Sequence, residues 1–85
     1  MENSFKIEVL VNTFMDVANA TILEYYFKYK FYPSAIVVSK RLYDMMMKYL
    51  VSVTTLTWVC PLTVIVDYDE TISVFSFKLY GKGEE

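Results

Sequence analysis

The first third of the chain carries one apolar stripe at helical spacing. Apolar side chains recur every three or four residues from Ile7 to Tyr29, which places them on one face of a helix. Ala18 is the small member of this stripe, where a partner element can approach closely. Pro33 disfavours helix at the residue before it and marks the end of the segment. Residues 5–11 also alternate between apolar and polar, so a short strand leading into the helix is an alternative there.

A short strand and a second helix are predicted to follow. The apolar run Ala35–Val38 is typical of a buried strand, and Ser39 stands where it can cap the next helix. Met47 falls off the apolar face of that helix, so we expect it to be exposed. The residues on the apolar face, at the spacing of an amphipathic helix, are Leu42, Met45, Met46, Tyr49 and Leu50.

No charged residue occurs between Tyr49 and Val66. The run approaches the length of about 20 residues that spans a bilayer, and basic residues precede it while acidic residues follow it. However, Pro61 would interrupt a helix here, and the later part of the run is dominated by Val, Ile and Thr, which suit a pleated sheet. We therefore predict buried strands in place of a membrane span. The predicted strands in the second half of the chain cover residues 55–60, 62–68 and 71–79.

Together these segments predict one α+β domain over residues 1–80, with a polar tail at 81–85. The order is helix, strand, helix and three strands, with both helices packed on a small, mainly antiparallel sheet. The acidic turn at 67–70 joins the last two strands as a hairpin. In the last strand the apolar residues change face between Val74 and Phe75, which indicates a sheet covered on both faces or a bulge.

The composition argues against an enzyme and against a bound cofactor, metal or small-molecule substrate. The chain has no His, and both glycines lie beyond Tyr80, so it lacks the commonest general base and any glycine-rich phosphate loop. Cys60 lies in an apolar segment, so we expect a buried, inert thiol. The carboxylates Asp67, Asp69 and Glu70 lack the remaining ligands of a calcium loop and are interpreted as a solvated turn.

Charge is distributed unevenly along the chain. Residues 28–48 contain five of the eight basic residues and one acidic residue, whereas residues 1–27 and 67–85 are net acidic. An aromatic run at 25–32 interleaves with two of the lysines. This combination is typical of a protein interface, including one between copies of the chain, or of a nucleic-acid-binding segment at 25–48. Alternatively, the tyrosines complete the core face of the first helix. The candidate interaction surface consists of Tyr26, Lys28, Tyr29, Lys30, Tyr32, Lys40 and Arg41.

The order of a helix, the segment Pro33–Ser39, a tyrosine-bearing helix and a strand pair resembles small proteins of tailed bacteriophages. Residues 20–79 also resemble the part of the tailed-phage capsid fold in which a short strand, a helix and an apolar strand pair follow in this order. Pro61–Val66 resembles one of those strands, with Cys60 where capsid proteins often carry glycine. The resemblance implies a non-enzymatic viral or prophage protein, located in the virion or the host cytoplasm.

These observations predict a structural or interaction protein that self-associates or binds a protein partner. A nucleic-acid-binding module and an inhibitor directed at the host are the alternatives. The net charge of −2 disfavours nucleic acid, because a net acidic chain repels phosphate backbones.

Overall fold

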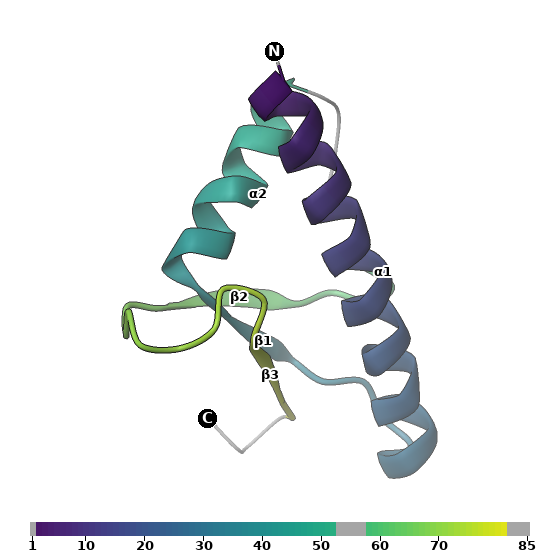
Figure 1. Ribbon diagram of the computed structural model, residues 1–85. Coiled ribbons are helices and arrows are strands. Elements are labelled where there is room, and N and C mark those ends of the chain that lie inside the picture. The colour runs from purple at the N-terminus through teal and green to yellow at the C-terminus, as the bar shows by residue number, and fades with distance from the viewer. Residues whose placement is uncertain (1, 53–57, 82–85) are drawn as a thin grey trace.

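In the computed structural model, which describes residues 2–52 and 58–81, two helices lie over one small sheet (Figure 1). The architecture confirms the predicted α+β class. Residues 5–11, for which helix and strand were both open, belong to the first helix. In chain order the elements are α1 (Glu2–Tyr29), β1 (Ala35–Ser39), α2 (Lys40–Ser52), β2 (Thr63–Asp67) and β3 (Phe77–Tyr80).

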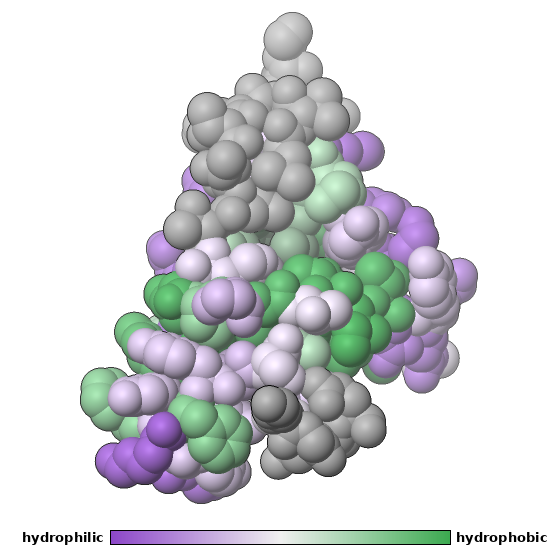
Figure 2. Space-filling model, turned by 180° about the vertical axis from the view of Figure 1, so that it is seen from behind, coloured by the Kyte–Doolittle hydropathy of each residue, from purple (hydrophilic) through white to green (hydrophobic). Residues whose placement is uncertain are grey.

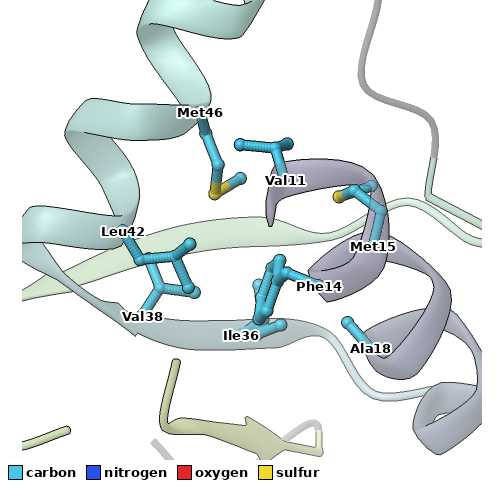
Figure 3. Close-up of a cluster of buried hydrophobic side chains, with 8 residues drawn as sticks. All are labelled: Val11, Phe14, Met15, Ala18, Ile36, Val38, Leu42 and Met46. Carbon is cyan, nitrogen blue, oxygen red and sulfur yellow. The ribbon is translucent and has the colours of Figure 1, made fainter. Parts of the chain in front are cut away.

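The inner face of α1 builds a large part of the core. The predicted stripe is confirmed from Val11 to Ile22, where the helix is buried and Ala18, its small member, has no exposed surface, whereas Tyr29 at its end is exposed. Met47 on α2 is exposed, as its position off the apolar face predicts. In Figure 3 side chains from both helices converge above the central strand. The cluster consists of Val11, Phe14, Met15 and Ala18 of α1, Ile36 and Val38 of β1, and Leu42 and Met46 of α2.

Phe14 connects α1 to the second half of the chain. Its ring stands edge-on to Trp58, with 6.4 Å between the ring centroids, and edge-on to Phe77 of β3, at 5.5 Å. Such T-shaped contacts are worth about 0.5–1.5 kcal/mol beyond the burial of the rings. One aromatic side chain thus holds the long helix to the loop before β2 and to the edge of the sheet.

The sheet is mixed, with the order β2–β1–β3. β1 pairs parallel with β2, so that Ile36 lies opposite Val64, and antiparallel with β3, so that Ile36 lies opposite Leu79. The sheet is therefore not mainly antiparallel, and the turn at 67–70 does not close a hairpin, because β1 lies between β2 and β3. The physical reason is the crossover through α2, which returns the chain to the same end of the sheet and makes β1 and β2 parallel.

The strand predicted at 55–60 lies partly outside the described residues, which omit 53–57. Its described part, Trp58–Cys60, is irregular and contains no strand. The backbone N–H of Val59 donates to the Asn19 side-chain oxygen at 3.1 Å, which ties this loop to α1.

The strand predicted at 71–79 is confined to its C-terminal part, because β3 begins only at Phe77. The preceding residues form turns, with the N–H of Ser76 donating to the carbonyl of Ser73 at 3.1 Å. These turns, and not a bulge, account for the change of face between Val74 and Phe75.

The uncharged run from Tyr49 to Val66 is divided between elements. Its start completes α2, and its end forms most of β2. Within the described part of the chain, neither helix has the length and apolar character needed to cross a membrane. The run therefore contributes to the packed domain at both of its described ends.

Ser39 forms the junction between β1 and α2. Its buried hydroxyl accepts a hydrogen bond from the N–H of Leu42 at 3.0 Å, which confirms the predicted helix cap. The same hydroxyl donates to the carbonyl of Val74 at 2.7 Å. The Ser39 side chain therefore caps α2 and also holds the loop before β3 against the sheet by a hydrogen bond.

α1 ends at Tyr29, four residues before Pro33. The next residue, Lys30, has a φ of 68°, and its N–H donates to the carbonyl of Tyr26 at 2.7 Å. A left-handed residue at this place is the usual way to end a helix, although glycine adopts the conformation with less strain. The left-handed turn sends the chain away from the helix axis toward β1.

Candidate functional site

Aromatic side chains gather at the C-terminal end of α1 and in the loop that follows it. In Figure 2 this end of the molecule lies at the lower left, where polar and apolar surface alternate. We call this group the aromatic surface. It consists of Tyr25, Tyr26, Phe27, Tyr29, Phe31 and Tyr32.

The rings of the aromatic surface contact one another in two groups. Tyr26 stacks on Tyr32, with centroids 4.6 Å apart and planes inclined by 25°. Tyr25 lies 4.6 Å from Tyr29, and Phe31 contacts both of these rings. Because ring pairs of this kind are mutually stabilising, the side chains are held in place before any partner binds.

The side chains of the aromatic surface differ in their exposure to solvent. Tyr25 and Tyr26 are half-buried, whereas Tyr29 and Tyr32 are exposed. Phe27 is 67% exposed and Phe31 48%. The tyrosines therefore complete the core face of α1 only in part, and the outer rings of the group remain in contact with water.

Two lysines flank the aromatic surface. The Lys28 ammonium lies 5.2 Å from the centroid of the Tyr29 ring, within the range of a cation–π contact. Lys30 is exposed in the left-handed turn. Five of the seven candidate residues thus lie together at one end of α1. These five are Tyr26, Lys28, Tyr29, Lys30 and Tyr32.

Lys40 and Arg41 lie elsewhere, in the first turn of α2 at the opposite end of β1. The Lys40 ammonium donates to both oxygens of Asp44 at 2.9 Å, and this hydrogen bond raises the pKa of Lys40. The predicted surface is therefore divided into two parts. Proximity in sequence joined them, but the strand between residues 35 and 39 separates them in space.

A second site surrounds Arg41. There the start of α2 and the loop after β2 enclose a pocket of about 310 Å³ with mixed charge. Tyr68, 70% exposed, lies on this pocket. Basic and acidic groups are both present, so the pocket has no single charge preference. Its lining consists of Ser39, Lys40, Arg41, Tyr68, Asp69, Glu70 and Ile72.

The aspartates of the acidic turn next to this pocket accept hydrogen bonds from groups within the turn. The N–H of Asp69 donates to Asp67, and Asp69 in turn accepts from the hydroxyl and the N–H of Thr71 at 2.6 and 2.9 Å. Those two bonds lower the pKa of Asp69. Among the residues that the structure describes, no three His, Cys, Asp or Glu side chains are grouped to hold a metal ion.

Cys60 is buried beside the loop after α1. Its Sγ lies 3.9 Å from the carbonyl of Pro33, and burial raises the pKa of the thiol. A thiol that is protonated and enclosed is a poor nucleophile. The predicted burial of Cys60 is confirmed, and its low reactivity stays a prediction.

The outward face of α1 carries exposed apolar side chains that the sequence pattern did not predict as a surface. Val9, Leu10, Val17 and Leu23 are exposed on it, together with Phe27. Helical spacing places Val9 and Phe27 on the side of α1 opposite the core stripe, with Leu10 and Val17 on one flank. On this side of α1 lies an apolar pocket of about 200 Å³. We call it the α1 pocket; it is lined by Leu10, Thr13, Phe14, Val17, Phe75 and Phe77.

Comparison of the chain with protein-family models, with curated proteins and with solved structures finds no match.

Proposed function

We propose that the protein is a non-enzymatic interaction protein that works by binding protein chains, copies of itself or another protein, through the C-terminal end of α1. The observation that carries this proposal is the aromatic surface, whose outer rings are exposed although the chain has a formed core. Aromatic side chains are enriched at protein interfaces, and their removal from water is strongly favourable.

The arrangement of the rings supports the same proposal. Rings already held by their neighbours lose little conformational entropy on binding, which favours association. Lys28 and Lys30 add a positive rim that would attract an acidic surface. Lys40 and Arg41 lie away from this end of the molecule, so Lys28 and Lys30 are the basic residues beside the rings. Nucleic-acid binding depends on many phosphate contacts, which favours a protein as the partner.

If the protein belongs to a tailed phage, as the resemblance implies, it would act in the virion or in the host cytoplasm. In a virion the bound chain would be a copy of the protein or a neighbouring structural protein. In the host cytoplasm it would be a host protein whose action is blocked. A gene located beside capsid or tail genes would favour the first setting, and one in an early operon would favour the second.

The proposal is tested with the double variant Tyr29→Ser/Phe31→Ser and the matched control Tyr68→Ser. Tyr68 is an exposed aromatic residue outside the aromatic surface, so its replacement removes similar area without altering the proposed site. Each protein is immobilised, incubated with host lysate, and its captured proteins are identified by mass spectrometry, while its own association is followed by sedimentation. We expect the double variant to lose association or specific capture and Tyr68→Ser to keep it.

The proposal fails if the double variant behaves like the unaltered protein in both measurements. A salt-sensitive shift of nucleic acid that requires Lys28 and Lys30 would replace it with the nucleic-acid alternative.

A further inference from the structure

We propose that two copies of the chain pair through the outer edges of their β2 strands, antiparallel about Ile65, so that their two sheets become one continuous sheet. This pairing goes beyond the proposed function, which concerns the C-terminal end of α1. In Figure 1 β2 is the strand farthest from the viewer. In Figure 2, which views the molecule from behind, apolar surface crosses the middle of that side.

The outer edge of β2 carries main-chain groups that point away from the sheet. β2 has β1 on one side, and no other strand of the described residues lies on its other side. The N–H of Thr63 donates to the carbonyl of Ser34 at 3.0 Å, so Thr63 and, by alternation, Ile65 direct their main-chain groups toward β1. The N–H and C=O groups of Val64 and Val66 therefore point outward, and an extended strand is the partner whose own main-chain groups match them.

The two edges of the sheet differ in the charge that they carry. Charged side chains, lysine above all, are the usual protection of an edge strand against pairing. β3 carries the exposed Lys78 within its short length, so two-fold pairing through β3 would bring the two copies of this ammonium close together. β2 has no charge from Thr63 to Val66, and its one charged residue, Asp67, stands at the end. One edge is therefore protected, and the other can accept a strand.

A two-fold axis at Ile65 makes β2 complementary to its own copy. The outward groups of Val64 then face those of Val66 of the other copy, and the same pair recurs on the other side of the axis. The Val64 side chain packs against the core, so Ile65, 38% exposed, lies on the face of the sheet away from the helices. Ile65 meets its own copy there, with the Cβ atoms about 5 Å apart, and both side chains lose exposed apolar surface.

The charges at the ends of β2 fit this pairing. Asp67 lies opposite Thr63 of the other copy, whose exposed side chain carries a hydroxyl that can donate to the carboxylate. The two copies of Asp67 are about 14 Å apart along the strands, beyond the Debye length of about 8 Å at physiological salt. The acidic residues that follow β2 lie farther from the axis, in the pocket at Arg41, where basic and acidic groups are both present.

Other positions of the axis fit less well. An axis at Val66 would halve the separation between the two copies of Asp67. An axis at Val64 would set Val66 opposite Leu62, which precedes the strand, and would shorten the paired segment. The axis at Ile65 pairs the strand over its whole length and keeps its carboxylates apart.

The first experiment is sedimentation equilibrium of the full chain over a range of concentrations up to about 0.5 mM, because a contact of one strand from each copy is small. The expected species has twice the monomer mass of 10.0 kDa. Ile65→Lys and Ile65→Glu each set like charges against each other at the axis, so each variant alone should dimerise about a hundredfold more weakly. An equal mixture of the two variants should recover the dimer, because each lysine then faces a glutamate.

Val17→Lys is the matched control. It adds the same charge at an apolar residue that is 52% exposed in the α1 pocket and away from β2, so the dimer should be unchanged. Circular dichroism and urea unfolding show whether each variant keeps its helices and its stability. Recovery in the mixture cannot come from misfolded chains, so it separates a broken contact from a broken fold.

A second experiment tests the register with engineered thiols. Ile65→Cys should form a disulfide-linked dimer under mild oxidation, since the axis brings the Cβ atoms of the two copies to about 5 Å. Thr63→Cys should not, because its two copies are about 14 Å apart along the strands. The unaltered protein should not cross-link either, because its single cysteine, Cys60, is buried.

Several results would overturn the pairing through β2. One is a strict monomer at about 0.5 mM, well above the micromolar range. Another is a mixture of folded Ile65→Lys and Ile65→Glu that associates no better than either variant alone. Cross-linking through Thr63→Cys in place of Ile65→Cys would refute the register. A mass that keeps rising with concentration would refute the closed dimer, because it indicates that β2 pairs with β3 of the next copy in an open chain.

The Tyr29→Ser/Phe31→Ser variant distinguishes this pairing from the proposed function. If the variant keeps the dimer and loses specific capture from lysate, both stand. If the folded variant loses the dimer, the copies associate through the aromatic surface and the pairing through β2 is refuted. If the chain is monomeric and the aromatic surface still captures another protein, the pairing through β2 is refuted and the proposed function stands. If the Ile65 variants behave as expected and Tyr29→Ser/Phe31→Ser keeps all binding, the aromatic surface is refuted as the working site.

Discussion

Replacement of Ser39 by alanine removes two hydrogen bonds at the junction of β1 and α2. The hydroxyl caps α2 through the N–H of Leu42 and holds the carbonyl of Val74, and the side chain is buried. Loss of a serine cap costs about 1 kcal/mol. An acceptor left without its partner costs about 1–3 kcal/mol when fully buried, and Val74 is only half-buried, so we take about 1 kcal/mol. The expected loss of unfolding free energy for Ser39→Ala is therefore about 2 kcal/mol.

Urea denaturation followed by circular dichroism measures this loss. For a domain of this size the slope is about 1 kcal/mol per M, so the midpoint should fall by roughly 2 M with the slope unchanged. Thr21→Ala is the control, because its hydroxyl makes one exposed hydrogen bond to the Val17 carbonyl within α1. We expect that variant to stay within about 0.5 kcal/mol of the unaltered protein.

A Ser39→Ala variant that loses less than about 0.5 kcal/mol would refute the account of this junction, since even the cap alone should cost more. A changed slope would show that unfolding is no longer comparable between the two proteins. A loss below that threshold would mean that the loop before β3 does not depend on the hydroxyl.

Three further predictions concern single residues. Lys30→Gly should raise the unfolding free energy by about 1 kcal/mol, because glycine adopts the left-handed conformation without strain, whereas Lys28→Gly inside the helix should lower it by a similar amount; urea midpoints compare the two. Asp69 has a lowered pKa in the folded protein, so its contribution is present above the ordinary value of 3.8 and is lost as the pH falls through the folded value; Thr71→Val should weaken that acid dependence in pH-dependent melting. Cys60 should react with a thiol reagent far more slowly in the folded protein than in urea, because it is buried and its pKa is raised; rapid reaction in the native state would contradict its placement.

Local patterns in the sequence predicted the local structure well. The spacing of Val11, Phe14, Ala18 and Ile22 identifies the buried side of α1, and the hydroxyl of Ser39 identifies the start of α2. These features depend on neighbours within a few residues, which is the range over which a sequence pattern carries information.

Pairing between strands was predicted less well. The sequence contains a strand, a helix and a strand at 35–67, and this order by itself favours a parallel pair, yet the acidic turn at 67–70 suggested a hairpin. The turns before Phe77 shorten the last strand and carry the chain past β1 to its other side. Which strand becomes central depends on contacts between distant residues, and no local pattern encodes it.

Only part of the candidate surface was predicted correctly, because the position of its members also depends on how distant segments pack. Lys28 and Lys30 lie among the aromatic rings as expected, but Lys40 and Arg41 follow β1 and lie at its other end. The outward face of α1 was not predicted, because the core stripe accounts for one side of the helix and leaves the apolar residues outside it without an assignment. Val17 and Phe27 differ from buried residues only in which side of the helix they occupy.

The central position of β1 also sets the order in which the sheet is completed during synthesis. Both strands that pair with β1 follow it in the chain, and the later one ends at Tyr80. Until Phe77–Tyr80 has left the ribosome, one edge of the apolar strand Ala35–Ser39 has no partner, and unpaired apolar edges promote aggregation. A proteolytic cut before Phe77 removes residues 77–85, and with them only one short strand, β3. It nevertheless exposes an edge of β1, the most buried strand of the protein, so truncated chains should be insoluble although both helices precede the cut.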